Sequence, residues 1–184
     1  NNDRLLRVGG HSKGGHLAMY ATAMCNESVR ERILNVYSND GPGFMKSVAT
    51  SKAMKDICPK LISIIPEESI VGLLMEPIGT PIVVKSTALS VGQHNLATWC
   101  LEGKELITVD DVSNTAKFVD KNLKKNVYKL SDEELNDFVE KLFSIFESTG
   151  AITLSDIKKS GLKGLQTMTK TANNLSKKLP KKKE

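Results

Sequence analysis

The stretch Val8-Gly9-Gly10-His11-Ser12-Lys13-Gly14-Gly15-His16 decides how the start of this chain folds. The apolar run from Leu5 to Val8 precedes its glycines and predicts the end of a β-strand. The small side chains of residues 16–24 follow and favour a helix. Since glycines break a strand, the sequence predicts a strand, a tight turn and a helix, with Ser12 in the turn.

Within this stretch, Gly10-His11-Ser12-Lys13-Gly14 matches the pattern GxSxG, which is typical of a serine nucleophile between a strand and a helix. Such a turn strains the backbone and exposes the serine hydroxyl. We expect the flanking residues Gly10 and Gly14 to be glycine because a Cβ atom at either position would collide with the neighbouring strand or helix. The Lys13 N–H begins the helix and is a natural hydrogen-bond donor to an oxyanion.

Two other interpretations of the turn stay open at this point. Glycine-rich turns between strand and helix also bind phosphate, although neither GxxxxGK[ST] nor GxGxxG is met here. Ser12 could also serve as the N-cap of the following helix, with no chemical role.

A nucleophilic serine needs a base, and in proteins with this turn the order along the chain is serine, acid, histidine. His94 lies after the fourth predicted strand and is the one histidine outside the glycine-rich stretch. In an open parallel sheet the carboxyl ends of the strands meet at one edge, so we predict that His94 is the base. His11 and His16 are expected to pack or cap instead.

Three carboxylates are candidates for the acid that orients the imidazole of His94. Glu67 and Glu68 follow the third predicted strand, and Asp40 follows the second. We prefer Glu68 because the unit before the histidine strand usually supplies the acid. Glu67 and Asp40 remain alternatives.

The rest of the chain predicts an α/β fold with a mostly parallel sheet and flanking helices. Strands are expected at 33–37, 61–65 and 81–84, with a helix in 44–57. Beyond Trp99 the sequence predicts appended helices: one at 113–127, and one that begins at the capping box Ser131–Glu134 and stops at Gly150. We therefore expect a core at 1–105, a helical extension at 106–159 and a basic, disordered tail at 160–184.

Composition limits the other possibilities. The chain has 184 residues and a net charge of +5, and the excess lies in a lysine cluster after residue 176. This tail could touch anionic surfaces weakly, but no specific nucleic-acid binding is predicted. Cys25, Cys58 and Cys100 form neither a CxxC pair nor a metal-ligand pattern, so we expect no metal, no cofactor and a reduced, cytoplasmic protein. No apolar run is long enough for a membrane span.

Several longer motifs carry a family resemblance over about residues 3–157: GHSKGGHLAMYA, VYSNDGPGF, PEESIVGLL, HNLATW, and KFVDKNL followed by LSDEELNDFVEKLFSIFESTGA. The chain resembles the Mbeg-like family of bacterial proteins of uncharacterised function, which is similar to class 3 lipases. The resemblance implies an α/β-hydrolase fold, with Ser12 as nucleophile, His94 as base and an acid near Glu68. The family pattern leads us to expect aspartate at the acid position, where this chain has glutamate.

The resemblance also implies strands and helices before the nucleophile, and few residues precede Ser12 here. We therefore expect the chain to be the carboxy-terminal half of a longer hydrolase, with an unpaired edge on its first strand and little activity by itself. The missing part would supply the second oxyanion donor. For the intact protein we predict an esterase-like or lipase-like serine hydrolase acting on a small-molecule or lipid ester. The alternative is an inactive binding or scaffold protein with the same fold. The oligomeric state is not predicted.

Overall fold

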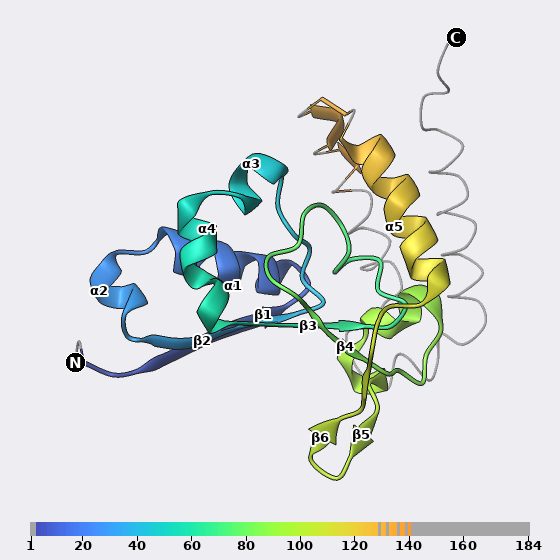
Figure 1. Cartoon of the computed structure of the whole chain (residues 1–184), viewed down its shortest axis with the longest axis horizontal. Helices are drawn as coiled ribbons and strands as arrows, with labels where there is room; N and C mark the ends of the chain where they lie inside the picture. Colours follow the sequence, from blue (N-terminus) through green and yellow to red (C-terminus); the bar gives the residue numbers. More distant parts are fainter. Residues whose placement is uncertain (1–2, 129, 132, 136, 139, 141–184) are drawn as a thin grey trace. The chain divides into compact units, whose positions relative to one another are not determined.

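The computed structural model describes residues 3–128, 130, 131, 133–135, 137, 138 and 140. The chain divides into two compact units, residues 1–124 and 125–184. The first unit contains the sheet and all of the predicted site residues (Figure 1).

The main sheet has the strand order β1-β2-β3-β4-β7. Its strands are β1 (Leu6–His11), β2 (Ile33–Asn39), β3 (Leu61–Pro66), β4 (Ile82–Val84) and β7 (Thr108–Val109). Strands β1 to β4 are parallel, and β7 pairs antiparallel with β4. The prediction of an α/β fold with a mostly parallel sheet is therefore confirmed. Strand β7 was not predicted, because two residues are too short for a periodic signal.

The helices of the first unit begin with α1 (Lys13–Met24), α2 (Glu27–Arg30), α3 (Lys46–Ala49) and α4 (Lys52–Ile57). In Figure 1 these four lie on the same side of β1, β2 and β3. The helix expected at 44–57 is split in two, because Ser51 caps α4 by accepting a hydrogen bond from the Met54 N–H at 3.3 Å. Shorter elements follow: the 3-10 helices Cys58–Lys60, Ser90–His94 and Leu96–Thr98, and a hairpin of β5 (Leu101–Glu102) and β6 (Glu105–Leu106).

The core lies between α1, α4 and the sheet. Its buried apolar residues are Ala18, Met19, Ala23, Ile33, Val36, Phe44, Met54, Ile57 and Ile78, and Leu6 and Val8 of β1 pack against them. Alternate residues of β1 therefore face the helices, as the two-residue period of a strand requires.

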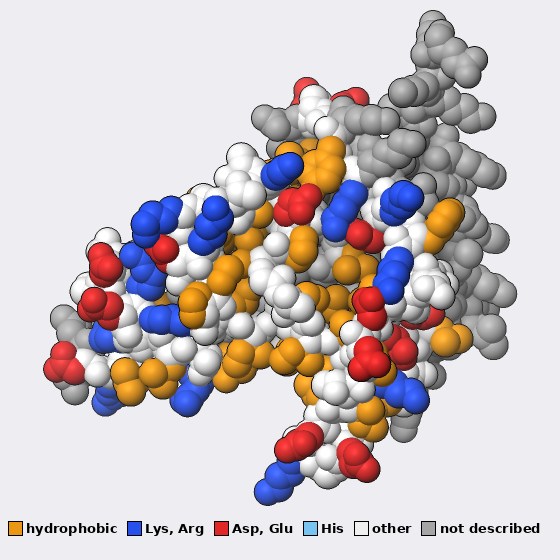
Figure 2. Space-filling view, viewed as in Figure 1, with side chains coloured by type: hydrophobic (Ala, Val, Ile, Leu, Met, Phe, Trp, Pro, Cys, Tyr) orange, Lys and Arg blue, Asp and Glu red, His pale blue; other side chains and the backbone are white. Residues whose placement is uncertain are grey.

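Strand β1 forms one edge of the sheet. Within the described part of the chain it pairs with β2 alone, as expected from the sequence. Exposed apolar side chains lie nearby, with Leu5 66% and Leu34 38% exposed. Figure 2 shows apolar side chains along the side of β1 to β3 that lies opposite α1 to α4. Such an edge offers unpaired backbone groups to another strand.

Helix α5 (Asn114–Val127) confirms the helix expected at 113–127. In the second unit, the Ser131 N–H donates to Glu134 Oε2 at 2.9 Å and the Glu134 N–H donates to Ser131 Oγ at 3.3 Å, which confirms the predicted capping box. The predicted stop at Gly150 and the basic tail at 160–184 lie outside the described residues. Among the described helices, none combines the length and apolar character that a membrane span requires.

Candidate active site

The turn at Ser12 joins β1 to α1 and holds a strained backbone. Ser12 has φ 57° and ψ −128°, a conformation that residues with a side chain rarely adopt. Its N–H donates to the carbonyl oxygen of Asn39 at 2.9 Å, which ties the turn to the end of β2. The Ser12 side chain makes no capping hydrogen bond to α1. The interpretation of Ser12 as a simple N-cap is therefore not supported.

Glycines let the strand and the helix approach each other, but not at both expected positions. A Cβ atom on Gly10 would lie 2.3 Å from the carbonyl carbon of Gly14, so Gly10 is required, as predicted. A Cβ atom on Gly14 would meet nothing within 4 Å, so the expected collision there was wrong. Gly14 is half-buried, and the close approach falls on Gly15 instead, where a Cβ atom would lie 2.7 Å from Ser38 Oγ.

The amino terminus of α1 begins immediately after the serine. The N–H groups of Gly15 and His16 donate to the carbonyl oxygen of Ser12 at 3.0 and 3.3 Å. The Lys13 N–H precedes them as the first amide of the helix, and such amides have no acceptor within the helix. This places a donor and the positive end of the helix dipole beside Ser12.

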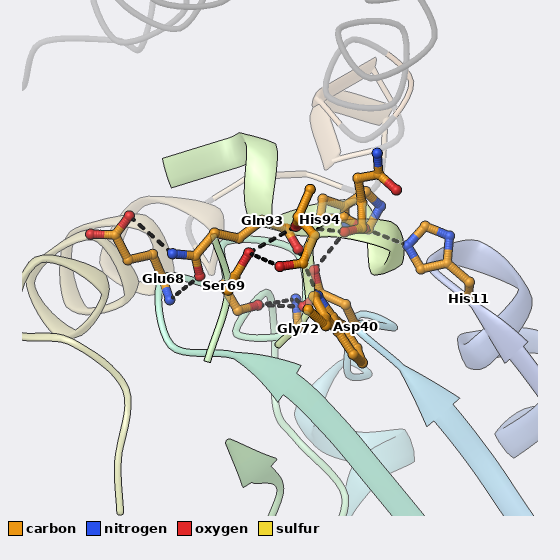
Figure 3. A network of polar contacts seen from close by, with 11 residues as sticks. His11, Asp40, Glu68, Ser69, Gly72, Gln93 and His94 are labelled. Atoms are coloured by element: carbon orange, nitrogen blue, oxygen red, sulfur yellow. Dashed lines mark hydrogen bonds and ion pairs between the residues drawn. The ribbon is translucent and has the colours of Figure 1, made fainter. Parts of the chain in front are cut away.

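His94 ends the 3-10 helix Ser90–His94 that follows β4, and its ring contacts Asp40 (Figure 3). The distance between His94 Nδ1 and Asp40 Oδ2 is 2.7 Å, and the two side chains are 12% and 1% exposed. Asp40 directly follows β2 with φ 48°. The carboxylate that contacts the His94 ring is therefore Asp40, the alternative from the sequence, and not Glu68, which the sequence order favoured. The reason is topological, because β2 lies next to β1 in the sheet and delivers Asp40 beside the Ser12 turn.

The second oxygen of Asp40 is also satisfied. Asp40 Oδ1 accepts a hydrogen bond from Ser69 Oγ at 2.5 Å and one from the Gly72 N–H at 3.0 Å. A Cβ atom on Gly72 would lie 2.6 Å from Asp40 Oδ1, so only glycine lets this amide approach. These donors compensate the burial of the carboxylate, which would otherwise be costly.

Glu68 holds the histidine loop rather than the histidine ring. Glu68 Oε2 accepts from the Ser90 N–H at 2.6 Å and from Gln93 Nε2 at 3.4 Å. In return, the Glu68 N–H donates to Gln93 Oε1 at 2.9 Å (Figure 3). Gln93 is 2% exposed, and the indole N–H of Trp99 donates to its carbonyl oxygen at 2.9 Å. Glu67, the other carboxylate considered, is held by backbone hydrogen bonds to Val84 and Ser113.

The remaining histidines differ in their surroundings. His16 Nδ1 lies 3.0 Å from the carbonyl oxygen of Gly43, and its ring stacks on Phe44 with centroids 4.0 Å apart. His16 therefore packs, as predicted. His11 Nε2 lies 2.8 Å from the carbonyl oxygen of His94, and the two rings are 4.4 Å apart. Partial desolvation and the nearby His94 ring lower the pKa of His11 from its ordinary value.

Sequence reasoning missed the groups that support Asp40 and the histidine loop. Ser69 and Gly72 lie in the motif PEESIVGLL, and the Gly72 N–H also donates to Ser69 Oγ at 2.9 Å. A serine three residues before a glycine is typical of a turn in which the serine side chain bonds to the backbone, but this spacing does not show that both groups contact Asp40. Cys25, Cys58 and Cys100 are free thiols. The described residues contain no group of three His, Cys, Asp or Glu side chains that could hold a metal ion.

The fold and the site together define an α/β protein with a serine turn, a histidine and a buried aspartate at the carboxyl edge of a mostly parallel sheet. Comparison with family models gives a match to the Mbeg1-like family over residues 1–144, and the chain belongs to this family. Searches among curated proteins and among solved structures gave no significant match.

Proposed function

We propose that this chain carries the catalytic residues of a serine hydrolase that acts on an ester, thioester or related acyl bond of a small molecule or lipid. Ser12 is the nucleophile, His94 the base and Asp40 the acid. The observation that carries the proposal is the 2.7 Å contact between His94 Nδ1 and a carboxylate that is 1% exposed. Such a pair orients an imidazole for general-base catalysis.

The contact supports a separate role for each ring nitrogen. Because Nδ1–H donates to Asp40, the other nitrogen, Nε2, is the one that takes the proton from the Ser12 hydroxyl. Attack of Ser12 Oγ on the acyl carbon then forms a tetrahedral intermediate, and His94 returns the proton to the leaving group. Asp40 stabilises the positive imidazole meanwhile, since its own charge stays compensated by Ser69 and Gly72.

The Lys13 N–H stabilises the negative charge that develops on the acyl oxygen. It is the first amide of α1 and follows the nucleophile directly. A donor fixed in this way needs no rearrangement during the reaction, and loss of one such donor typically lowers kcat by about 10²- to 10³-fold. In the second step, water activated by His94 hydrolyses the acyl-enzyme and restores Ser12.

A fluorophosphonate probe tests the proposal, because it labels activated serines whatever the natural substrate is. The protein should be labelled at Ser12, as located by peptide mass spectrometry. Ser12→Ala should abolish labelling, and His94→Ala should slow it by at least ~10³-fold. Met45→Ala is the control, because Met45 is an exposed residue of the first unit outside the site. A folded protein that stays unlabelled would contradict the proposal and favour a binding or scaffold protein.

A further inference from the structure

We propose that His11 is a positioning residue that sets the place of the base His94, an inference that rests on the proposed hydrolase function. His11 is the last residue of β1 and directly precedes Ser12. Its ring reaches the residue 83 positions later in the chain. It therefore joins the strand of the nucleophile to the loop of the base (Figure 3).

The direction of this hydrogen bond follows from its chemistry. The acceptor is the backbone carbonyl oxygen of His94, at 2.8 Å, so His11 Nε2 must carry the proton. The ring contact at 4.4 Å makes a positive charge on both imidazoles unfavourable. Since His94 becomes positive during the reaction, the neighbouring ring has to be neutral. The lowered pKa of His11 agrees with a neutral ring at pH 7.

The contact complements the other attachments of His94. Asp40 fixes the ring of His94. The preceding residue, Gln93, is held by hydrogen bonds from the Glu68 N–H and the indole N–H of Trp99. His11 bonds to the backbone carbonyl of His94 itself. Without it, the backbone at the end of the 3-10 helix could rotate and move the ring relative to Ser12. A displacement of about 1 Å at such a site can cost 10²-fold in rate.

A role in the core does not explain His11, because this residue is exposed at the end of the edge strand. A variant should therefore leave the fold intact while it disturbs the base. His11→Phe keeps a ring against His94 but removes the donor, and His11→Gln keeps a side-chain N–H donor. Arg7→Gln is the matched control, because Arg7 is exposed and lies on the same face of β1 as His11.

The experiment measures the rate of fluorophosphonate labelling and the hydrolysis of a short-chain p-nitrophenyl ester by the protein. We expect His11→Phe to lower the labelling rate and kcat by about 10- to 100-fold with little change in KM or Tm. His11→Gln should recover most of this loss, and Arg7→Gln should match the wild type. Equal losses in His11→Phe and His11→Gln, or no loss in either, would overturn the proposal.

A second measurement separates this proposal from the proposed function. The proton of His94 Nδ1 bound to Asp40 should give a strongly downfield NMR signal whether or not the protein is an active hydrolase. The signal should persist in His11→Gln and broaden or vanish in His11→Phe. An unlabelled wild type would refute the hydrolase alone, whereas an unchanged signal in His11→Phe would refute the positioning role.

Discussion

Replacement of Asp40 by asparagine is the sharpest test of the acid in this site. Asparagine has nearly the same shape, so its amide oxygen can still accept from Ser69 and Gly72, which now bond to Asp40 Oδ1. Its NH2 group then lies where Oδ2 was, 2.7 Å from His94 Nδ1. Two donors cannot face each other, so His94 must move its proton from Nδ1 to Nε2.

The wrong tautomer removes the acceptor that Ser12 needs. A change of this kind in a serine, histidine and aspartate triad lowers kcat by about 10⁴-fold. We therefore expect Asp40→Asn to reduce hydrolysis of a p-nitrophenyl ester by about 10³- to 10⁴-fold, or about 4 to 5.5 kcal/mol of transition-state stabilisation. Circular dichroism and a thermal melt of the same sample establish that the fold is retained.

The matched control is Glu68→Gln, which also exchanges a carboxylate for an amide beside the same loop. Its oxygen can still accept from the Ser90 N–H, and no contact to the His94 ring is removed. We expect a loss of less than about tenfold. Asp40→Asn with activity within tenfold of the wild type would refute the reasoning. A loss in Glu68→Gln as large as that in Asp40→Asn would refute it as well.

Three further predictions concern stability, and urea unfolding measures each. Gly10→Ala should lower the free energy of unfolding by at least about 2 kcal/mol, because the new Cβ would lie 2.3 Å from the carbonyl carbon of Gly14. Gly14→Ala should leave the free energy of unfolding unchanged or raise it by up to about 1 kcal/mol. Equal losses in the two variants would contradict the geometry. Ser38→Ala should leave stability unchanged or raise it by up to about 1 kcal/mol, because Ser38 Oγ is buried and has no hydrogen-bond partner among the described residues. A loss above about 2 kcal/mol would contradict this reasoning. The pKa of His11 in the folded protein is below its ordinary value of 6.5, so between the folded and the unfolded pKa the unfolded chain binds more protons and the free energy of unfolding rises with pH. His11→Gln should flatten this dependence of stability on pH. An unchanged dependence would exclude His11 as its source.

Much of the fold was predictable because its signals are local. The order of strand, turn and helix follows from the residues of one short segment, and β1 and α1 form there. The expected break at the glycines was wrong, because β1 continues through Gly9 and Gly10 to His11, and α1 already begins at Lys13. The parallel strands β2, β3 and β4 are short apolar runs that end in turn-forming residues. Such patterns predict strand positions well, since burial on both faces requires continuous apolar runs.

The carboxylate that contacts His94 was not predictable in the same way. Glu68 and Asp40 both follow strands, and sequence order alone favoured the unit nearer to His94. The choice depends on which strand lies beside β1, and the sheet order places β2 there. The steric role assigned to Gly14 failed for a similar reason, because the spacing within GxSxG does not show which side of α1 faces the strand.

The hydrogen bonds of the sheet explain why Ser12 and Asp40, the proposed nucleophile and acid, lie together. The pairing of β1 with β2 continues one residue beyond β1, where the Ser12 N–H donates to Asn39 at 2.9 Å. The same happens one strand further, where the Asp40 N–H donates to Ile64 at 2.7 Å. Both residues have positive φ, at 57° and 48°.

Each of these strained residues is therefore held by the neighbouring strand rather than by its own loop. Strain of this kind typically costs about 1–3 kcal/mol per residue, so it persists only where the surroundings fix the backbone. The sheet register, which pairs His11 with Asn39, sets Ser12 and Asp40 side by side at the same edge. A change in the later loop could displace His94, but it would leave Ser12 and Asp40 in place. The position of His94 relative to Ser12 and Asp40 therefore depends on the contacts that His11 and Glu68 make with the His94 loop, those of Glu68 being with Gln93 and Ser90.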